Sequence, residues 1–197
     1  MSHQYRGPEI SNPIQGHGLK VIVDTANVAY ENQNGPNEKA KVENVLLMRQ
    51  RLLSLGFCPI FIADASLRYN VDEPHKFDHL EQSGQIMQSP AGTEADYFCL
   101  SLAERDTLPV VSNDFYRDRE LEFPIAAREL RVPFMIVDNQ VILEQEQLRK
   151  AVALAHNHHN DFQHCHDTGQ QHEQESSDEP EQPEHRGHHG GHHRRAS

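Results

Sequence analysis

Short apolar runs alternate with helical patterns along most of the chain. The runs contain few polar positions, so both faces of the strands they predict are expected to be buried, as in a parallel sheet covered by helices. These strand runs occupy residues 19–23, 57–63, 85–88 and 108–111, and 134–137 with 141–143 form a closing hairpin. The alternation indicates an α/β fold with a mostly parallel central sheet.

Helices are predicted between the strands, where apolar positions recur on one helical face. Their approximate ranges are 42–55, 73–82, 93–103 and 116–130. Gly56 ends the first of them, and Thr93 is expected to open the third, whose apolar stripe begins at Ala95.

The composition of the chain changes abruptly after residue 155. Residues 156–197 contain almost no aliphatic side chains and carry most of the 15 histidines, so they cannot bury enough apolar surface to offset the entropy of ordering. Residues 1–17, with Pro8 and Pro13, are expected to form a flexible lead. The sequence therefore predicts one domain over 18–155 and a disordered tail over 156–197.

Charge and cysteine content limit the classes of protein. A net charge of −12 argues mildly against a nucleic-acid partner, although carboxylates gathered around a divalent cation would create a place for phosphate. The three cysteines lack paired spacing, which indicates a reducing compartment. No signal-peptide core and no apolar segment of ~20 residues is present, so we expect a soluble cytoplasmic protein with no membrane partner.

Aspartates fall where the predicted strands end. Asp24, Asp64 and Asp114 follow strands, and Asp96 lies in the first turn of the helix after the third strand. The carboxyl ends of parallel strands meet along one edge, where open α/β folds bind ligands. Carboxylates gathered there would repel one another unless a cation were bound, and Mg²⁺ or Mn²⁺ suits such oxygen ligands.

Each aspartate also has a purely structural interpretation. Asp24 and Asp114 could cap the elements that follow them, Asp96 lies at the third position of the helix opened by Thr93, and Asp64 is an ordinary loop residue. It is less expected that three helix caps coincide at one edge of the sheet than that these aspartates form a functional site there. Within the sequence we find no GxSxG motif, Walker loop or Cys/His pair that would supply another chemistry.

Three motifs resemble the NYN branch of the PIN-like nucleases, and most closely the regnase-type endoribonucleases that degrade messenger RNA. They are VIVDTANVA at 21–29, PAGTEADYFCLSLA at 90–103 and VVSNDFYRD at 110–118. The resemblance covers about residues 19–143. It implies a PIN-like three-layer α/β/α sandwich and a metal-dependent endoribonuclease that hydrolyses RNA with Mg²⁺ or Mn²⁺.

The resemblance also implies roles for individual residues. Asp24, Asp96 and Asp114 match the family's metal-binding carboxylates. Asn27 matches an asparagine that supports the metal site by hydrogen bonding, and Asp118 matches a further acidic member of the cluster.

Substrate binding is assigned to the third motif. Arg117 lies where its guanidinium could contact a phosphate, and an ion pair with Asp114 or Asp118 is the alternative. Ser112 and Asn113, which precede Asp114, are assigned to substrate binding as well.

The chain departs from the regnase-type pattern in two respects. Ala95 replaces the first of two adjacent aspartates, and Glu94 lies about 100° away around the helix. The CCCH zinc finger of the animal proteins is missing. A non-catalytic RNA-binding or scaffold module is therefore the main alternative. A haloacid-dehalogenase-type phosphatase is less favoured because Ala26 stands where a second acid is required.

The histidine-rich tail and the oligomeric state leave further alternatives. HNHH, HCH and HHGGHH lack the fixed spacing of a structural zinc site, so weak binding of transition metals is the most that we expect of the tail. Below about pH 6.5 its histidines would become cationic and could help to hold RNA. Many PIN-like domains dimerise, and a homodimer stays open.

Overall fold

The computed structural model describes residues 14–33, 35 and 38–169. The chain forms two units, Met1–Asp161 and Phe162–Ser197. The first unit contains the sheet and the packed core. The described part of the second, residues 162–169, is the end of the last helix.

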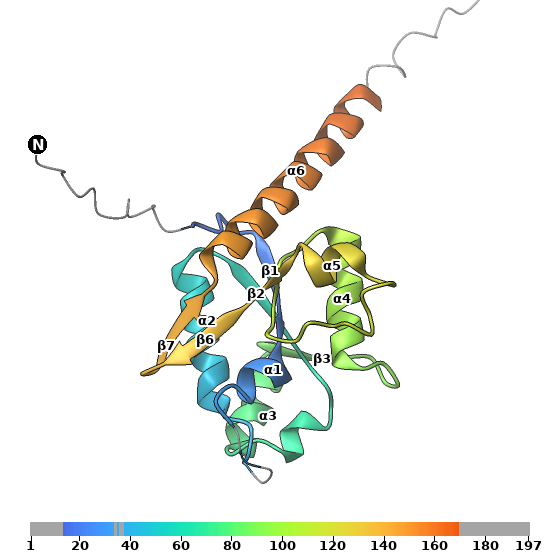
Figure 1. Cartoon of the computed structure of the whole chain (residues 1–197). Helices are drawn as coiled ribbons and strands as arrows, with labels where there is room; N and C mark the ends of the chain where they lie inside the picture. Colours follow the sequence, from blue (N-terminus) through green and yellow to red (C-terminus); the bar gives the residue numbers. More distant parts are fainter. Residues whose placement is uncertain (1–13, 34, 36–37, 170–197) are drawn as a thin grey trace, which may run out of the picture. The chain divides into compact units, whose positions relative to one another are not determined.

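A five-stranded sheet with all neighbours parallel lies at the centre of the first unit, in the order β3-β2-β1-β4-β5. Figure 1 labels β1, β2 and β3 of this sheet. The strands are β1 (Lys20–Asp24), β2 (Cys58–Ala63), β3 (Ile86–Gln88), β4 (Val110–Val111) and β5 (Arg131–Val132). The apolar residues of β1 and β4 are fully buried, as expected of strands covered on both faces. The predicted α/β class is thus confirmed.

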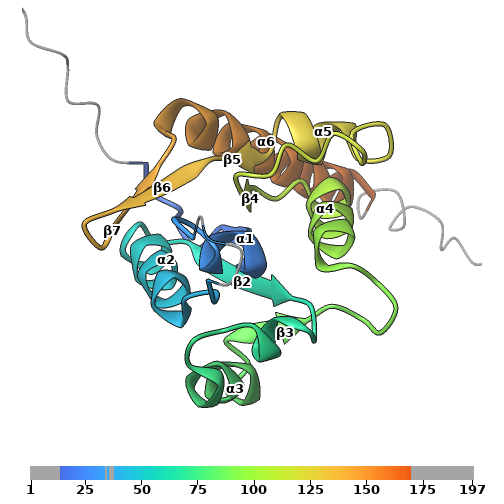
Figure 2. The same cartoon turned by 60° about the horizontal axis from the view of Figure 1, so that its bottom comes forward.

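Helices cover both faces of this sheet (Figure 2). They are α1 (Thr25–Ala29), α2 (Val42–Ser54), the 3₁₀ turn η1 (Leu67–Tyr69), α3 (Pro74–Gln82), α4 (Ala95–Asp106) and α5 (Pro124–Arg128). Right-handed crossovers place α2 and α3 on one face, and α4 and α5 on the other, because the strand order reverses direction between β3 and β4. The result is a three-layer α/β/α arrangement.

The reversal of strand order creates a crevice between β1 and β4. The chain builds β2 and β3 on one side of β1 and then crosses to build β4 and β5 on the other. Val23 pairs with Val111, so Asp24 and Ser112 leave the sheet side by side. A topological switch point of this kind is where open α/β sheets bind ligands, at the carboxyl ends of the strands.

The prediction of a single helix over 116–130, after β4, was wrong. Residues 117–122 form turns, and only Pro124–Arg128 are helical before the unpredicted strand β5. Tyr116 has φ +50, and Phe123, just before Pro124, has φ −127 and ψ 65. Neither conformation continues a helix. For Phe123 the cause is Pro124, because proline disfavours the helical region for the residue before it.

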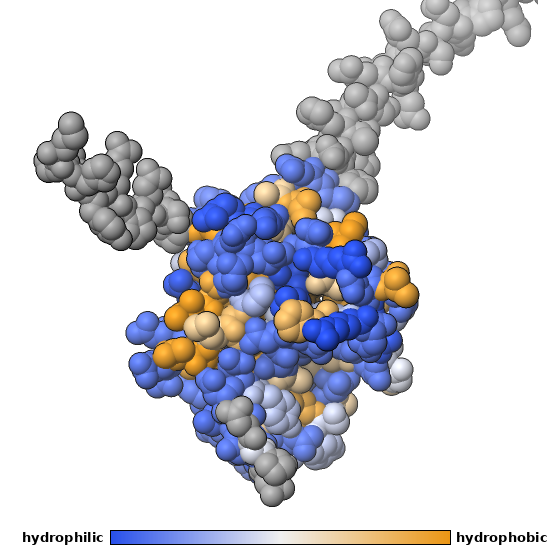
Figure 3. Space-filling view, in the orientation of Figure 1, coloured by the Kyte–Doolittle hydropathy of each residue, from blue (hydrophilic) through white to orange (hydrophobic). Residues whose placement is uncertain are grey.

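The predicted hairpin is confirmed as β6 (Phe134–Val137) and β7 (Gln140–Leu143), an antiparallel pair. Asp138 and Asn139 both have positive φ, as a two-residue type I′ turn requires. Met135, Val137 and Ile142 are about half exposed, and Figure 3 shows apolar side chains gathered over this hairpin.

A long helix that was not predicted, α6 (Gln145–Gly169), follows the hairpin. Its buried residues, Leu148, Ala151, Val152 and Ala155, recur on one face and dock its first turns. The expected domain end at residue 155 falls inside it. Residues 156–169 are helical rather than disordered, since extending a nucleated helix costs little. No helix in the described part is long and apolar enough to cross a membrane.

The last residues of the predicted lead over 1–17, from 14 onward, belong to the fold. Gly16 is buried, its amide donates to the Leu55 carbonyl oxygen at 2.7 Å, and Ile14 packs against the core. The flexibility predicted for residues 1–13 and the disorder predicted for 170–197 concern parts of the chain outside the described residues.

Candidate active site

An acidic pocket of about 690 Å³ opens at the carboxyl edge of the sheet. Most of the residues that line it carry carboxylates: Asp24, Glu31, Asp64, Glu94, Asp96, Asp114 and Asp118. The structure therefore brings together Asp118 and the four aspartates expected at this edge, three from strand ends and Asp96 from the first turn of α4.

Asp24 is the most buried carboxylate of the pocket, with 7% of its surface exposed. Its Oδ1 accepts a hydrogen bond from the Asn27 amide at 3.1 Å, so Asp24 is the N-cap of α1. Its Oδ2 accepts from the Tyr116 hydroxyl at 3.1 Å and the Ser112 hydroxyl at 3.4 Å. Burial raises the pKa of Asp24, these three hydrogen bonds lower it, and the charge of Asp114 raises it again.

The raised pKa predicts that Asp24→Asn stabilises the metal-free protein. The folded state holds the Asp24 proton more tightly than the unfolded state, so this stability is present in acid and is lost as the pH rises through the folded pKa. At neutral pH the variant should unfold at a higher temperature than wild type. Thermal unfolding in EDTA measures the difference, which should shrink near pH 3.8, the ordinary pKa of the group. A variant that unfolds below wild type at neutral pH would contradict this account.

Asn27 and Ser112 connect the start of α1 to the loop after β4. The Asn27 Oδ1 accepts from the Asn113 amide at 2.7 Å. The hydroxyl of Ser112, which is fully buried, donates to Asp24 and accepts from the Asp114 amide at 3.1 Å. The two loops that carry Asp24 and Asp114 are thus held together by side-chain hydrogen bonds.

Ser112 and Asn113 were predicted to bind substrate, and the structure gives their side chains other partners. The Asn113 Nδ2 donates to the Phe134 carbonyl at 3.0 Å and to Glu31 at 3.1 Å, while its Oδ1 accepts from the Phe134 amide at 2.9 Å. Ser112 has no exposed surface. For Ser112 this packing corrects the expectation of direct substrate contact, while contact by the half-buried Asn113 stays a prediction from the sequence.

Asp114 is exposed and held by a local turn. Its Oδ1 accepts from the Tyr116 amide at 2.9 Å, which is an Asx turn and not the helix cap that was the structural alternative. Tyr116 is 1% exposed, and burial together with the charge of Asp24 raises the pKa of its hydroxyl well above the ordinary value. Tyr116 therefore stays a proton donor to Asp24. Nothing in the residue pattern indicated this role, because a helix was expected to begin at that residue.

Asp64 holds the start of the helix that carries Asp96. Its Oδ1 accepts from the Ala95 amide at 3.0 Å and from the Ser89 hydroxyl at 3.2 Å. The helix begins at Ala95, so the prediction that Thr93 caps it was wrong, and Asp64 satisfies the amide from outside. Ala95 is 3% exposed, as expected from its place in the apolar stripe.

Two arginines of the third motif differ in their partners. Arg119, which sequence reasoning missed, is paired with Glu94 and lies 3.7 Å from Asp96 and 3.9 Å from Asp118. Arg117 forms no ion pair within the described residues, and its guanidinium lies 5.4 Å from the centre of the Phe115 ring. The alternative in which Arg117 pairs with Asp114 or Asp118 is therefore wrong. A helix over this segment would have placed these side chains differently.

The donor set of the pocket fits a hard divalent cation. Within the described residues, no three His, Cys, Asp or Glu side chains already lie close enough together to hold a metal ion. Mg²⁺ keeps several of its waters and binds to proteins through one or two carboxylates, so it needs fewer protein ligands than a closed site. The buried Asp24 and the exposed Asp114 provide such oxygens at one edge.

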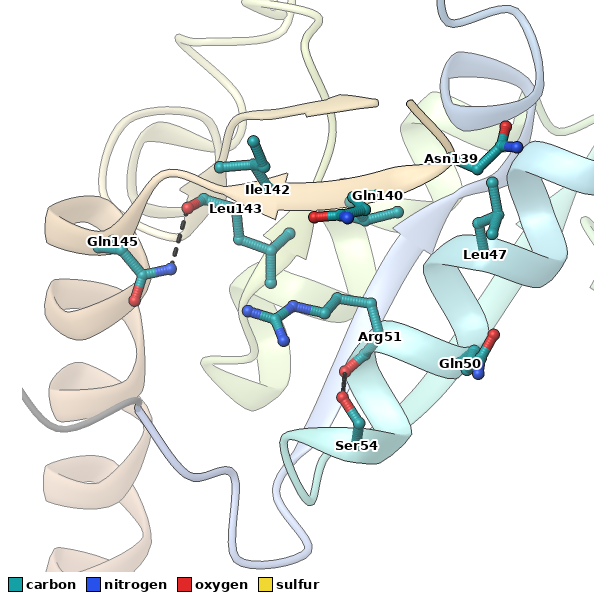
Figure 4. A pocket seen from close by; sticks show the side chains of 10 residues that line it. Leu47, Gln50, Arg51, Ser54, Asn139, Gln140, Ile142, Leu143 and Gln145 are labelled. Carbon is teal, nitrogen blue, oxygen red and sulfur yellow. Dashed lines mark hydrogen bonds between the residues drawn. The ribbon is translucent and has the colours of Figure 1, made fainter. Parts of the chain in front are cut away.

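A second hollow, of about 450 Å³, lies between α2 and β7 (Figure 4). Its described lining consists of aliphatic, hydroxyl and amide side chains with one guanidinium, that of Arg51, and holds no carboxylate. In Figure 4 the Arg51 side chain points from α2 toward the hairpin. Its chemistry does not suit a divalent cation.

An acidic pocket at the carboxyl edge of a parallel α/β/α sheet defines the class of PIN-like nucleases. The family model of the Zc3h12a-like ribonuclease NYN domain matches residues 18–158. The chain belongs to this family and is an RNA-cleaving nuclease. No curated protein matches the chain.

Two solved structures of the nuclear protein-only RNase P 2 (PRORP2) of Arabidopsis thaliana share the fold. Each has a TM-score of 0.54, with 19% and 20% sequence identity, and they cover 64% and 66% of this chain. This chain spans only 30% of the length of each PRORP2 chain. The predicted PIN-like three-layer α/β/α sandwich is confirmed.

Proposed function

We propose that this protein is a metal-dependent endoribonuclease, in which Asp24, Asp96 and Asp114 hold Mg²⁺ or Mn²⁺. The observation that carries the proposal is the meeting of these carboxylates in one pocket of an NYN ribonuclease domain, with Asp24 buried at its base. A buried carboxylate whose pKa is raised by desolvation gains a favourable partner when a cation is near.

The chemistry divides between the ion and the protein. When bound, such an ion lowers the pKa of a water molecule and neutralises charge that develops on the phosphate. Three hydrogen bonds fix the orientation of Asp24, and the Asx turn fixes Asp114. Asn27 holds the two loops together, and Asp118 is an outer acidic member of the cluster whose carboxylate lies 3.9 Å from the Arg119 guanidinium. Preorganised groups of this kind need no rearrangement during the reaction.

Arg117 is assigned to the RNA backbone. Its guanidinium is exposed and forms no ion pair within the described part of the chain. A guanidinium presents donors in a planar fork that matches two phosphate oxygens. It would therefore offset part of the repulsion between the acidic pocket and the RNA.

A non-catalytic RNA-binding module is the second candidate, and the observation that favours it concerns Ala95. This residue is buried and has no oxygen ligand in its side chain, at the position where the regnase-type motif carries its first aspartate. In that case RNA would bind to the pocket and stay intact with every metal.

The proposal predicts internal cleavage of single-stranded RNA with Mn²⁺ or Mg²⁺ and none in EDTA. The physical reason is that the carboxylates alone repel the phosphate and supply no activated water. End-labelled RNA and a circular RNA, resolved on denaturing gels, measure the products, and matched DNA tests the choice of sugar. Cleavage of the circle establishes internal cutting, while RNA that binds but stays intact with both metals would favour the binding module.

We also assign the protein to the cytoplasm. Cys58 is exposed and Cys99 is buried, and both are free thiols. Free thiols are typical of a reducing compartment. Homodimer formation and weak metal binding by the tail stay predictions from the sequence.

A further inference from the structure

An exposed aromatic residue follows directly in the chain after Asp114, which lines the acidic pocket. Phe115 is 60% exposed and precedes the buried Tyr116. Its Cα lies only ~3.8 Å from that of Asp114, although the Phe115 side chain does not line the pocket itself. A phenylalanine with so much exposed surface contributes little to the core, so core packing does not explain why an aromatic residue stands at this position.

Two guanidinium groups flank this ring. The Cζ of Arg131 lies 4.6 Å and that of Arg117 5.4 Å from the centre of the Phe115 ring. Arg131 is half-buried, and its Nη1 donates to the Ser112 carbonyl oxygen at 3.4 Å, which fixes it to the loop after β4. We call Phe115, Arg117 and Arg131 the aromatic–arginine platform.

The charges of the platform are available to a ligand. Arg119, in the same region, is neutralised by Glu94, Asp96 and Asp118. Neither Arg117 nor Arg131 has an ion pair among the described residues. Two guanidinium groups that form no ion pair within the described residues therefore lie at one exposed aromatic ring, in the segment that follows Asp114.

We propose that this platform binds one unpaired nucleotide of the RNA, next to the phosphate at Asp114. The base stacks on Phe115, and Arg117 and Arg131 contact the adjoining phosphates. The inference rests on the proposed function, whose substrate it defines as a strand with a splayed base. In a duplex the bases are stacked within the helix, so an intact duplex cannot offer one to the ring.

Stacking is the kind of interaction that this protein needs. The chain carries a net charge of −12, so the overall charge of the protein does not favour the approach of RNA phosphates. A base stacked on an aromatic ring contributes affinity independently of net charge and tolerates any base, because each has a π face. Guanidinium groups at the same place add local positive charge where the phosphates lie.

The test compares Phe115→Ala with a matched control, Tyr69→Ala. Tyr69 is 75% exposed and has the Arg68 guanidinium 5.2 Å from its ring, but it lies in η1 and not in the loop that carries Asp114. Binding of fluorescent oligouridylate is measured by anisotropy in the full-length Asp24→Asn background with Mg²⁺, where the RNA is not consumed. We expect Phe115→Ala to weaken binding about tenfold and Phe115→Trp to restore it. Tyr69→Ala should bind as the parent protein does.

A scan with single abasic nucleotides makes the assignment specific. One position of the oligonucleotide should lose about tenfold in affinity on removal of its base, and this penalty should vanish in Phe115→Ala. Unchanged affinity in Phe115→Ala, an equal loss in Tyr69→Ala, or a penalty that persists in Phe115→Ala would each overturn the platform. Binding is read separately from cleavage, so a wild-type protein that binds and never cuts would refute the proposed function and leave this test intact.

Discussion

Asp24→Asn is expected to lower the rate of RNA cleavage about a thousandfold, while the protein stays folded. Asparagine has the same shape as aspartate, so its Oδ1 can still accept from the Asn27 amide and its Nδ2 can donate to the oxygens of Ser112 and Tyr116. What the variant lacks is the negative charge that attracts the cation. The loss should therefore fall on kcat and on the metal concentration required, and less on RNA affinity.

The matched control is Asp106→Asn on the helix that carries Asp96. Asp106 lies ten residues further on, about 15 Å along the axis, and pairs with Arg105 at 2.6 Å. Single-turnover cleavage with Mg²⁺ and Mn²⁺ measures all three proteins. Full activity in Asp24→Asn would remove Asp24 from the site, and an equal loss in Asp106→Asn would point to a general effect of charge.

The sheet and the acidic edge were predictable because local sequence encodes both. The strand that ends at Asp24 carries three consecutive buried apolar residues at 21–23, and in this sheet its neighbours are parallel. Once strands are parallel, their carboxyl ends share an edge, and residues just beyond them must meet. The convergence of Asp24, Asp64 and Asp114 follows from that geometry without knowledge of any contact.

The segment between β4 and β5 could not be predicted in the same way. Its conformation depends on contacts that are distant in sequence, such as the hydrogen bond from Tyr116 to Asp24 and the ion pair of Arg119 with Glu94. A left-handed Tyr116 has no signature in a residue-type pattern, because nothing local favours that conformation for tyrosine. Strain of this kind persists when surrounding contacts determine it, and it clusters at functional sites.

Asn113 shows how strongly the site relies on such distant contacts. Its side chain both donates to the Phe134 carbonyl and accepts from the Phe134 amide. The backbone amide of Asn113 donates to the Asn27 Oδ1, so this residue connects α1, the loop after β4 and β6. The positions of Asp24 and Asp114 relative to each other are therefore coupled to the packing of the hairpin.

Asn113→Ala is expected to lower the free energy of unfolding by about 2–4 kcal/mol, because it leaves the amide and carbonyl of Phe134 without partners in a half-buried place. That is a large share of the ~5–15 kcal/mol that stabilises an ordinary domain. Urea unfolding followed by circular dichroism measures the change, with Asn70→Ala as control, since the exposed Asn70 side chain donates only to the Ser66 carbonyl. A loss below about 0.5 kcal/mol would mean that water replaces the bridge, and the loop could then hold Asp114 without the hairpin. A large loss in Asn113→Ala alone would show that the acidic edge and the hairpin fold as one unit.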